Sequence, residues 1–471
     1  MKKERFLVSE RTLDEATLVA PLGDDLKVSA ERDLKTFRTD DGGTFLLGDA
    51  WNCVPNGKRP SEILNELSKR EGGIDEREVL EASHAWGGRF VVISRDFAFS
   101  GAFGLMPIFV SKDGFSNDPG LLAEIFGNER AETRLGFMDW IPSQASPYDG
   151  IERLVPSKIL DPKTKTRRSR RIVPTKESLD RLGLSGNPKE VVPDMLATIM
   201  RNACETYGDR RILIPITGGR DSRTVLACGL KAGIGFEAFT FRNPDMPAGD
   251  LRISEEVCKK AGVARYVLDE TKGRRSKKRA DEYETATRGI VFGRDLEYAE
   301  RGRYDDLVER FGKVALFRGG VSELAGTPYA KFFSERMGSD ETISFYGLSG
   351  REAVAVRRYV AERGDEETTG LAPQELFYAD QRIGSWLSAI ESGFSIYDDV
   401  VSIQPFSCPA IVAKFLELPR EERVGKKHLD ETTTNAAPVL AGIPYAGETL
   451  RDKVGGIPNK LKWKARKILK K

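Results

Sequence analysis

The stretch RILIPI-TGGRDS-RTVLACGL, from Arg211 to Leu230, decides the fold of this chain. Its first part, Arg211 to Ile216, is mostly apolar and predicts a buried strand. Two glycines predict a tight turn after it, and the residues up to Leu230 have helical potential. Because amide groups at the start of such a helix point at whatever lies in the turn, we expect this strand–turn–helix unit to bind phosphate.

The side chains of the turn suit the same chemistry. Gly218 and Gly219 allow close approach of the backbone, Thr217 and Ser222 supply hydroxyl groups, and Asp221 is placed to hold a divalent cation beside a phosphate chain. A plain strand–helix connection capped by Asp221 or Ser222 is the alternative for a two-glycine turn alone. The turn is neither a Walker A loop, which ends in G-K-[ST], nor a dinucleotide fingerprint, which has a third glycine.

Length and composition narrow the class of protein. A chain of 471 residues predicts about two or three domains, and 74 basic against 72 acidic residues give no argument for nucleic-acid binding. No apolar window is long enough for a membrane span, and the apolar run near the N-terminus is too short for a signal peptide. An odd number of cysteines without a C-x-x-C pair predicts reduced thiols in a cytoplasmic protein: Cys53, Cys204, Cys228, Cys258 and Cys408.

Residues 1–160 are expected to be rich in β-structure, because short apolar or alternating runs are bounded by Gly, Asp and Asn. Helical periodicity predicts helices at 60–70 and 77–86. The segment 87–118 predicts three or four strands of one antiparallel sheet. The basic stretch KTKTRRSRRIVP, residues 163–174, is interpreted as a solvated connector between two domains, with an anion site as the alternative.

From about residue 178 the pattern alternates between helices and strands. Beyond the opening stretch, strands are predicted at 236–241, 265–269 and 313–320, and helices at 188–207 and 250–262. Such an order predicts an α/β fold with a parallel sheet and helices on both faces. Residues 273–310 and 330–471 look mainly helical.

Several motifs in order resemble the asparagine synthetase family, which includes the β-lactam synthetases and belongs to the ATP pyrophosphatase superfamily. TGGRDS resembles the family's S-G-G-x-D-S pyrophosphate loop, and Asp250 begins a helix like the one that follows the family's second strand. The other similar segments are WGGRFVVISRD (86–96), DGIERLVPSKIL (149–160), RGGVSELAG (318–326) and residues 377–419. The resemblance implies an Ntn-type α-β-β-α glutaminase-like domain at 1–170 and a Rossmann-like adenine nucleotide α-hydrolase domain at 178–471.

The resemblance implies an activity and a set of site residues. The activity is an ATP-dependent, AMP-producing ligase that adenylates a carboxylate and passes it to an amine or ammonia, with Mg²⁺ as cofactor. The implied nucleotide-binding residues are Thr217, Gly218, Gly219, Arg220, Asp221, Ser222, Thr240, Phe241, Gly319 and Gly320. The implied metal ligands are Asp221 and Glu323, and the implied catalytic residues are Glu323, Lys426 and Lys427. Arg220 and Arg223 suit a bidentate phosphate clamp, with solvated surface arginines as the alternative.

Two departures from the family pattern matter. Lys2 stands where glutamine-hydrolysing members carry the cysteine nucleophile, and the nearest cysteine is Cys53, so no glutaminase activity is expected. Ser322 and Glu323 replace the family's Asp-Glu pair, which removes one expected magnesium ligand. Glu323 as an acid that stabilises a helix N-terminus is the structural alternative.

Other functions remain open at this point. A tRNA-modifying adenylating enzyme would need a cysteine pair and a nucleic-acid surface, and neither is visible in the sequence. A non-catalytic or other adenylating descendant, acting on a specialised substrate such as a surface polysaccharide or peptide natural product, is the second hypothesis. The tail Lys460–Lys471 interleaves lysines with apolar residues, as membrane-surface segments do, although a solvated terminus is the preferred interpretation. A homodimer is a further expectation.

Overall fold

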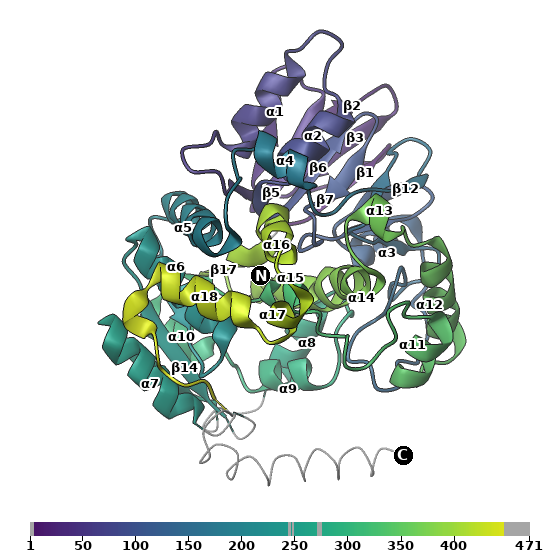
Figure 1. Cartoon of the computed structure of the whole chain (residues 1–471). Coiled ribbons are helices and arrows are strands. Elements are labelled where there is room, and N and C mark those ends of the chain that lie inside the picture. Colours follow the sequence, from purple (N-terminus) through teal and green to yellow (C-terminus); the bar gives the residue numbers. More distant parts are fainter. Residues whose placement is uncertain (1–3, 244–245, 247–248, 271–275, 447–471) are drawn as a thin grey trace.

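Two antiparallel six-stranded sheets lie face to face in the N-terminal part of the chain (Figure 1). The structure, a computed structural model, describes residues 4–243, 246, 249–270 and 276–446. The first sheet has the order β10-β8-β9-β1-β3-β2, with β1 Phe6–Ser9, β2 Leu18–Leu22, β3 Leu26–Ala30, β8 Ile108–Val110, β9 Gly114–Ser116 and β10 Glu152–Leu154. The second has the order β12-β11-β7-β6-β5-β4, with β4 Thr36–Arg38, β5 Thr44–Asn52, β6 Trp86–Ser94, β7 Ala98–Ser100, β11 Lys158–Leu160 and β12 Arg167–Ser169.

Alternating apolar residues explain why these sheets stack. Phe6 and Val8 of β1 point toward Phe45 and Leu47 of β5, and all four side chains are buried in one core cluster. Helices α1 Pro60–Ser68, α2 Glu76–Ser83 and α4 Lys176–Arg181 pack on the outer face of the second sheet, and α3 Pro119–Phe126 packs beside β9. The antiparallel sheets of this part agree with the expected richness in β-structure, and the Ntn-type α-β-β-α arrangement and its assignment to the glutaminase type stay predictions.

Three predictions for this part were wrong in detail. The strands within 87–118 do not form one sheet, because β6 and β7 belong to the second sheet and β8 and β9 to the first. Trp86 begins β6 and does not end a helix. The basic stretch 163–174 is not simply a solvated connector: it supplies β12, and Arg170 is only 5% exposed. The Arg170 guanidinium donates to backbone carbonyls and lies over the Phe99 ring, which explains its burial.

A five-stranded parallel sheet forms the centre of the C-terminal part. Its order is β15-β14-β13-β16-β17, with β13 Arg211–Pro215, β14 Glu237–Arg242, β15 Arg265–Asp269, β16 Val314–Phe317 and β17 Val400–Ile403. The first four strands confirm the sequence prediction. The fifth, β17, lies in a segment that the sequence predicts to be mainly helical. The chain first forms the central strand β13 and then adds β14 and β15 on one side of it. It next adds β16 and β17 on the other side.

Helices cover both faces of this sheet, as expected (Figure 1). One face shares a core with α5 Pro188–Thr206, α6 Arg220–Ala232, α7 Asp250–Ala261, α16 Pro409–Leu416 and α18 Lys427–Ala436. The other face packs against residues of α10 Asp305–Phe311 and α15 Ser388–Gly393, and α8 Lys277–Ala286 lies against α15. The remaining helices are α9 Arg294–Glu300, α11 Ser339–Tyr346, α12 Gly350–Glu362, α13 Glu366–Thr369, α14 Pro373–Phe377 and α17 Arg420–Val424, and a π-helix at Tyr378–Leu387 joins α14 to α15.

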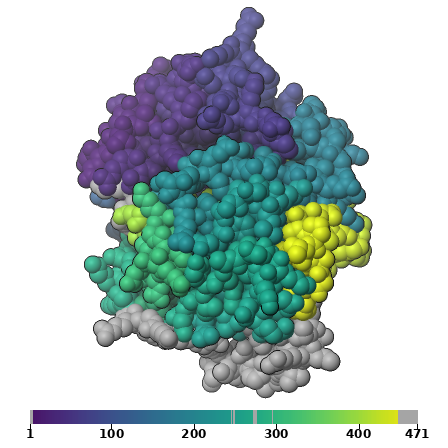
Figure 2. All heavy atoms as spheres, turned by 90° about the vertical axis from the view of Figure 1, so that its left-hand side faces the viewer, coloured from purple at the N-terminus to yellow at the C-terminus, as the bar shows by residue number. Residues whose placement is uncertain are grey.

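The N-terminal sandwich sits directly on the C-terminal part along a broad contact (Figure 2). The indole of Trp51 donates to the Thr206 hydroxyl at 3.1 Å, and the Gly88 amide donates to the Ser407 hydroxyl at 2.8 Å. Within the described residues, no helix has both the length and the apolar character that crossing a membrane requires. The basic tail Lys460–Lys471 lies outside the described residues, and the cytoplasmic location and the homodimer stay predictions.

Candidate functional site

Two glycine-containing loops meet at the carboxyl edge of the parallel sheet. One follows β13 and leads into α6, and the other, Arg318–Glu323, follows β16. These are the neighbouring strands between which the order of the sheet reverses. In open parallel α/β sheets, ligands bind in the crevice at this switch point. The topology therefore places both predicted loops, although they are far apart in sequence, at one site.

Glycine at 319 is what lets the two loops touch. A Cβ on Gly319 would lie 2.9 Å from the backbone carbon of Asp221, closer than side chains approach backbone. Gly320 donates its amide to the Gln404 side chain at 2.8 Å, and a Cβ there would meet the same amide oxygen. Gly319 is thus required by the close approach of backbone, whereas a side chain at Gly320 would displace the side chains of Gln404 and Leu387.

Asp221 is the centre of a polar cluster built from three segments. The Ser322 hydroxyl donates to Asp221 Oδ1 at 2.7 Å, and Lys426 Nζ lies 3.7 Å from Asp221 Oδ2. In the sequence, Ser322 stands where the family has a magnesium ligand. In the structure, its hydroxyl is bound to Asp221 of the loop after β13. Lys426 comes from the chain just before α18 and brings the positive charge predicted for this site.

Glu323 lies beside this cluster in a half-buried position. Burial and, to a lesser extent, the negative charge of Asp221 together raise the pKa of Glu323 to about 7, although Lys426 and Arg382 oppose the change. A carboxyl group with a pKa near neutrality can hold or release a proton under physiological conditions. Such a pKa is typical of functional groups and is not expected of a solvated helix-terminal acid.

The backbone on both sides of the cluster is strained. Val321 has a φ of +75°, although β-branched residues avoid the left-handed region, and Lys426 has a φ of +60°. Such conformations cost on the order of 1–3 kcal/mol each and persist where the surrounding structure holds them. Here the strain places Ser322 and the Lys426 ammonium next to Asp221.

The turn itself is held in shape by its own side chains. The Thr217 hydroxyl accepts from the Gly219 amide at 3.1 Å and lies 3.1 Å from the Ser222 hydroxyl, while Asp250 Oδ1 accepts from the Gly218 amide at 2.9 Å. Helix α6 begins after Gly219, and the amides of its first turn have no side-chain cap, as an anion site requires.

Three residues predicted to act in the site use their side chains for other contacts: Arg220, Arg223 and Lys427. Arg220 pairs with Asp430 at 2.8 Å, and Arg223, only 1% exposed, donates to backbone carbonyls of the segment before Tyr445. Both guanidiniums stack on the Tyr445 ring at about 4 Å, so they anchor this segment against α6, and the geometry does not support the phosphate clamp. Lys427 pairs with acids at 3.5 and 3.7 Å on the outside of α17 and α18, away from Asp221.

The two residues predicted to lie along the adenosine sit on β14. The hydroxyl of Thr240 is buried and donates to the Ile216 carbonyl at 2.9 Å, so this hydroxyl is not available to a nucleotide. The ring of Phe241 is half-buried and packs edge-on against Tyr304, with centroids 5.5 Å apart.

The described residues fit a magnesium ion only in combination with a phosphate ligand. Asp221 and Glu323 supply two carboxylates, and the described chain holds no group of three or more His, Cys, Asp or Glu side chains able to bind a metal. Magnesium in nucleotide sites is commonly bound by one or two carboxylates together with phosphate oxygens and water. The donor set therefore fits Mg²⁺ bound with ATP.

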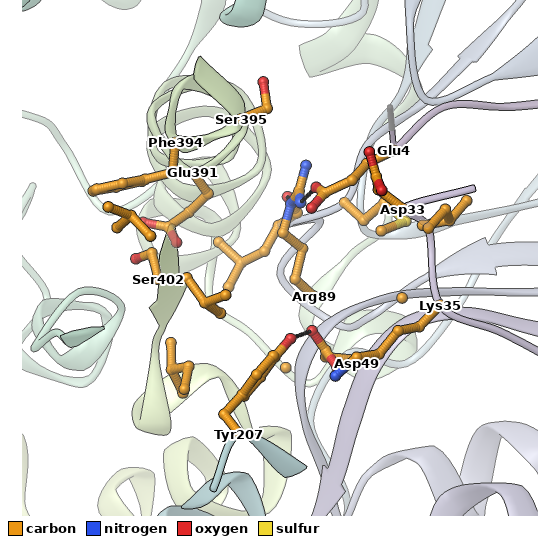
Figure 3. Close-up of a pocket in the computed structure, with 18 of the residues that line it drawn as sticks. Glu4, Asp33, Lys35, Asp49, Arg89, Tyr207, Glu391, Phe394, Ser395 and Ser402 are labelled. Atoms are coloured by element: carbon orange, nitrogen blue, oxygen red, sulfur yellow. Dashed lines mark hydrogen bonds and ion pairs between the residues drawn. The ribbon is translucent and has the colours of Figure 1, made fainter. Parts of the chain in front are cut away.

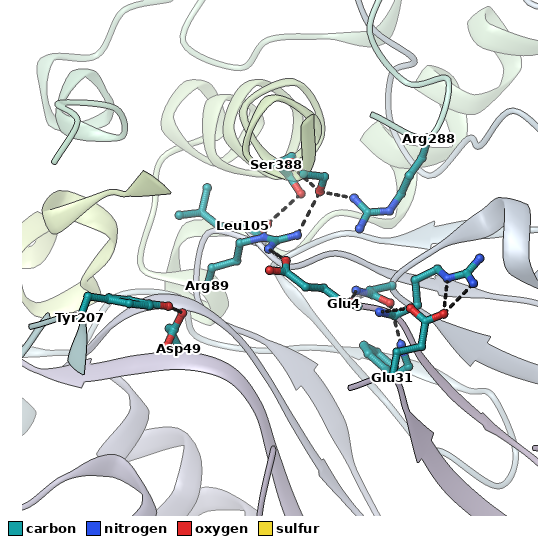
Figure 4. Close-up of polar contacts among 12 residues, drawn as sticks. Glu4, Glu31, Asp49, Arg89, Leu105, Tyr207, Arg288 and Ser388 are labelled. Atoms are coloured by element: carbon teal, nitrogen blue, oxygen red, sulfur yellow. Dashed lines mark hydrogen bonds and ion pairs between the residues drawn. The ribbon is translucent and has the colours of Figure 1, made fainter. Parts of the chain in front are cut away.

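A cavity of about 430 Å³ lies between the N-terminal sandwich and β17, apart from the loops after β13 and β16 (Figure 3). Its charges are largely matched within the cavity: Arg89 lies 3.0 Å from Glu4, Lys35 lies 2.8 Å from Asp49, and Tyr207 also donates to Asp49 (Figure 4). None of the described residues that line it is a cysteine. Cys53 is completely buried elsewhere, and burial raises the pKa of its thiol, so it is not a reactive nucleophile.

Sequence reasoning missed the contacts through which several residues contribute to the site. Ser322 and Gln404 act through contacts across the sheet, and a single sequence contains no signal for such contacts. Asp430 likewise becomes visible only when α18 is seen packed against α6. The signal in the sequence that does indicate the site is the pair of glycines that follows each of β13 and β16.

Comparisons with known proteins add little. No protein-family model matches the chain, and no curated protein matches it. Among solved structures, it is similar to NMN synthetase from Francisella tularensis, with 14% identity, 45% of this chain and 92% of that chain covered, and a TM-score of 0.23. Glutamine-dependent NAD+ synthetase from Acinetobacter baumannii in complex with ADP matches with 13% identity, 73% and 69% coverage, and a TM-score of 0.23. NAD+ synthetase from Burkholderia pseudomallei matches with 15% identity, 54% and 98% coverage, and a TM-score of 0.20. These values are too low to assign a family or an activity, so the asparagine synthetase resemblance stays a prediction.

Proposed function

We propose that this protein is an ATP-dependent ligase that activates a carboxylate as an acyl-adenylate and transfers it to an amine or ammonia. The observation that carries the proposal is the meeting of the loops after β13 and β16 at the switch point, joined through Asp221, Ser322 and Lys426. Such chemistry needs a helix start that can bind phosphate, two carboxylates and a lysine close together, and these groups meet at one edge of the sheet.

In the first step, a carboxylate oxygen of the substrate attacks the α-phosphorus of ATP and the bond to the β-phosphate breaks, releasing pyrophosphate. The first-turn amides of α6 and the hydroxyls of Thr217 and Ser222 would bind the phosphate oxygens as negative charge shifts onto pyrophosphate. Mg²⁺, bound by Asp221 and Glu323 with the phosphates, would supply further positive charge. Lys426 adds a cation 3.7 Å from Asp221.

In the second step, the amine nitrogen attacks the acyl carbon, and the bond from that carbon to the AMP oxygen breaks. The attacking nitrogen must lose a proton, and Glu323 is the acceptor with a suitable pKa, about 7. Glu323 cannot accept a proton while it binds a metal, so this role belongs after pyrophosphate has left. Lys426 would stabilise the oxyanion of the tetrahedral intermediate.

A second candidate, nucleotide binding without ligation, has one observation in its favour. Ser322 carries no charge, yet it donates to an oxygen of Asp221 that a metal would otherwise use. A descendant that binds ATP but no longer cleaves it would keep the glycine turn and tolerate this change.

Thermal unfolding and product analysis separate the two candidates. The ligase is expected to show an ATP-dependent rise in the unfolding temperature, and to form AMP and pyrophosphate with at least one member of a carboxylate panel. Stabilisation by ATP without AMP formation across the panel would favour the binding protein. Absence of both effects would contradict the nucleotide site itself.

A further inference from the structure

Two polar side chains of the π-helix Tyr378–Leu387 lie near the acids of the candidate site. The positive charge of Arg382 opposes the rise in the pKa of Glu323, so these two groups interact. Burial raises the pKa of Tyr378, and the negative charges of Glu323 and Asp221 contribute to the rise. Because π-helical turns are rare in proteins and occur frequently at functional sites, this helix is a candidate wall of the site.

The π-helix is held in place by contacts with the N-terminal sandwich. Asp380 accepts hydrogen bonds from the Ser157 amide at 3.0 Å and from the Ser157 hydroxyl at 2.7 Å. A Cβ on Gly384 would lie 2.6 Å from Cγ of Pro156, so the helix lies directly against this proline. Pro156 and Ser157 join β10 to β11, and their contacts give the side chains of the π-helix a rigid backbone.

Two indole rings flank the guanidinium of Arg382. It lies 3.4 Å from the centroid of the Trp386 ring and 4.9 Å from that of Trp140. The Trp386 indole is fixed in turn, because it donates to Asp295 at 2.8 Å. Stacking on a ring uses the flat face of a guanidinium and leaves the N–H groups at its edge free to donate. The guanidinium is therefore positioned before any ligand binds.

The polar ends of both side chains lack hydrogen-bond partners in the described part of the chain. The N–H groups of the Arg382 guanidinium donate to no acceptor there, and the Tyr378 hydroxyl forms no hydrogen bond there. Both residues are half-buried. The charge of Arg382 acts on Glu323 and Asp295, but neither of these acids lies within 4.0 Å of it. The donors of Arg382 and Tyr378 are thus available to a ligand.

The chemistry of these donors fits a carboxylate. Two parallel N–H groups of a guanidinium can donate to both oxygens of a carboxylate, and a phenol can add a third hydrogen bond. A substrate carboxylate that approaches Asp221 and Glu323 meets two like charges, so it needs a cation nearby. Lys426 already pairs with Asp221 at 3.7 Å, whereas Arg382 has no ion pair among the described residues.

We propose that Arg382 and Tyr378 bind the carboxylate group of the acid substrate. Arg382 offsets its charge and orients it, and a lone pair that accepts no hydrogen bond remains for the attack on ATP. The site then selects an ionised carboxylate over an uncharged amide or ester. The identity of this carboxylate as the one that is adenylated rests on the proposed function, but its binding can be tested without ATP.

Calorimetric titration of the full chain with sodium acetate and with acetamide, at an ionic strength held constant with sodium chloride, tests the binding. Acetate is expected to bind at least roughly tenfold more tightly than acetamide. Arg382→Gln should weaken acetate binding by roughly tenfold or more, and Arg382→Lys and Tyr378→Phe should each weaken it several-fold. Arg310→Gln is the matched control, because it removes an exposed guanidinium that lies 4.3 Å from the Tyr266 ring centroid, and it should leave binding unchanged.

Equal binding of acetate and acetamide, no binding of acetate, or an unchanged affinity for acetate in a folded Arg382→Gln variant would overturn the carboxylate site. In pyrophosphate exchange, Arg382→Gln should raise the KM for the carboxylate by roughly tenfold or more and change the KM for ATP by less than about twofold. A rise in the KM for ATP alone would overturn the site, because Arg382 would then bind phosphate. Acetate binding through Arg382 without exchange for any carboxylate would contradict the ligase and leave the carboxylate site standing.

Discussion

Replacing Glu323 by glutamine should stabilise the protein above neutral pH. In the folded protein the pKa of Glu323 is about 7, against an ordinary value of 4.5, because burial and Asp221 disfavour its ionised form. The unfolded chain therefore ionises first, and the wild-type protein loses stability as the pH rises from 4.5 to 7. Each pKa unit is worth about 1.36 kcal/mol, so this rise corresponds to about 3 kcal/mol. Glutamine does not ionise, so the Glu323→Gln variant does not lose this stability as the pH rises.

The assay is urea unfolding of Glu323→Gln and wild type at a series of pH values, with Glu309→Gln on the exposed surface of α10 as the control. The difference in unfolding free energy between Glu323→Gln and wild type should be small below pH 4.5 and grow to about 3 kcal/mol above pH 7. A difference that is independent of pH, or that shrinks as the pH rises, would refute the raised pKa. The same variant should lose amide formation, because glutamine accepts no proton from the attacking amine.

Three further predictions concern the site and the core. Lys426→Ala should slow adenylate formation by roughly tenfold or more, whereas Lys427→Ala should change it by less than about twofold, and equal effects in an AMP-release assay would contradict the placement of the two lysines. Gly319→Ala should force apart the loops after β13 and β16 and reduce activity by roughly a hundredfold, and wild-type kinetics in this variant would show that their contact is dispensable. Burial lowers the pKa of both His84 and His428 to about 4 from 6.5, so each contributes stability above pH 6.5 that is lost as the pH falls toward 4, up to about 3 kcal/mol. Urea unfolding of the Glu323→Gln variant at a series of pH values measures this loss. An unfolding free energy that does not change between pH 6.5 and pH 4 would disprove it.

The architecture of the C-terminal part could be predicted from the sequence because its signals are local. The apolar run Arg211–Pro215 and the strand Arg265–Asp269 are each bounded by turn residues, and alternation with helices is typical of parallel sheets. Strand β17 was not predicted because it is short and lies between two 3₁₀ turns, Phe394–Ile396 and Pro405–Ser407. Only its pairing with β16 identifies it as a strand.

Residues whose environment depends on distant segments could not be predicted. Arg223 looks like a surface or phosphate-binding residue beside Asp221, but the segment ending at Tyr445 folds over it and buries it. Asp295 and Trp386 are separated in sequence, and only the packing of α9 against the π-helix makes them neighbours. The raised pKa of Glu323 likewise comes from burial and the charge of Asp221, neither of which the sequence alone reveals.

Exchange of labelled pyrophosphate into ATP, measured for wild type and Asp221→Asn with a panel of carboxylates, tests the central claim most directly. Adenylation is reversible, so the wild type should incorporate label into ATP with its own carboxylate before any amine is added. Asp221→Asn should remain folded, because asparagine can still accept the hydrogen bond from Ser322, yet lose exchange by roughly a hundredfold or more as the charge at the phosphate loop disappears. Exchange by Asp221→Asn at the wild-type rate would contradict the assignment of the loops after β13 and β16 as the adenylation site.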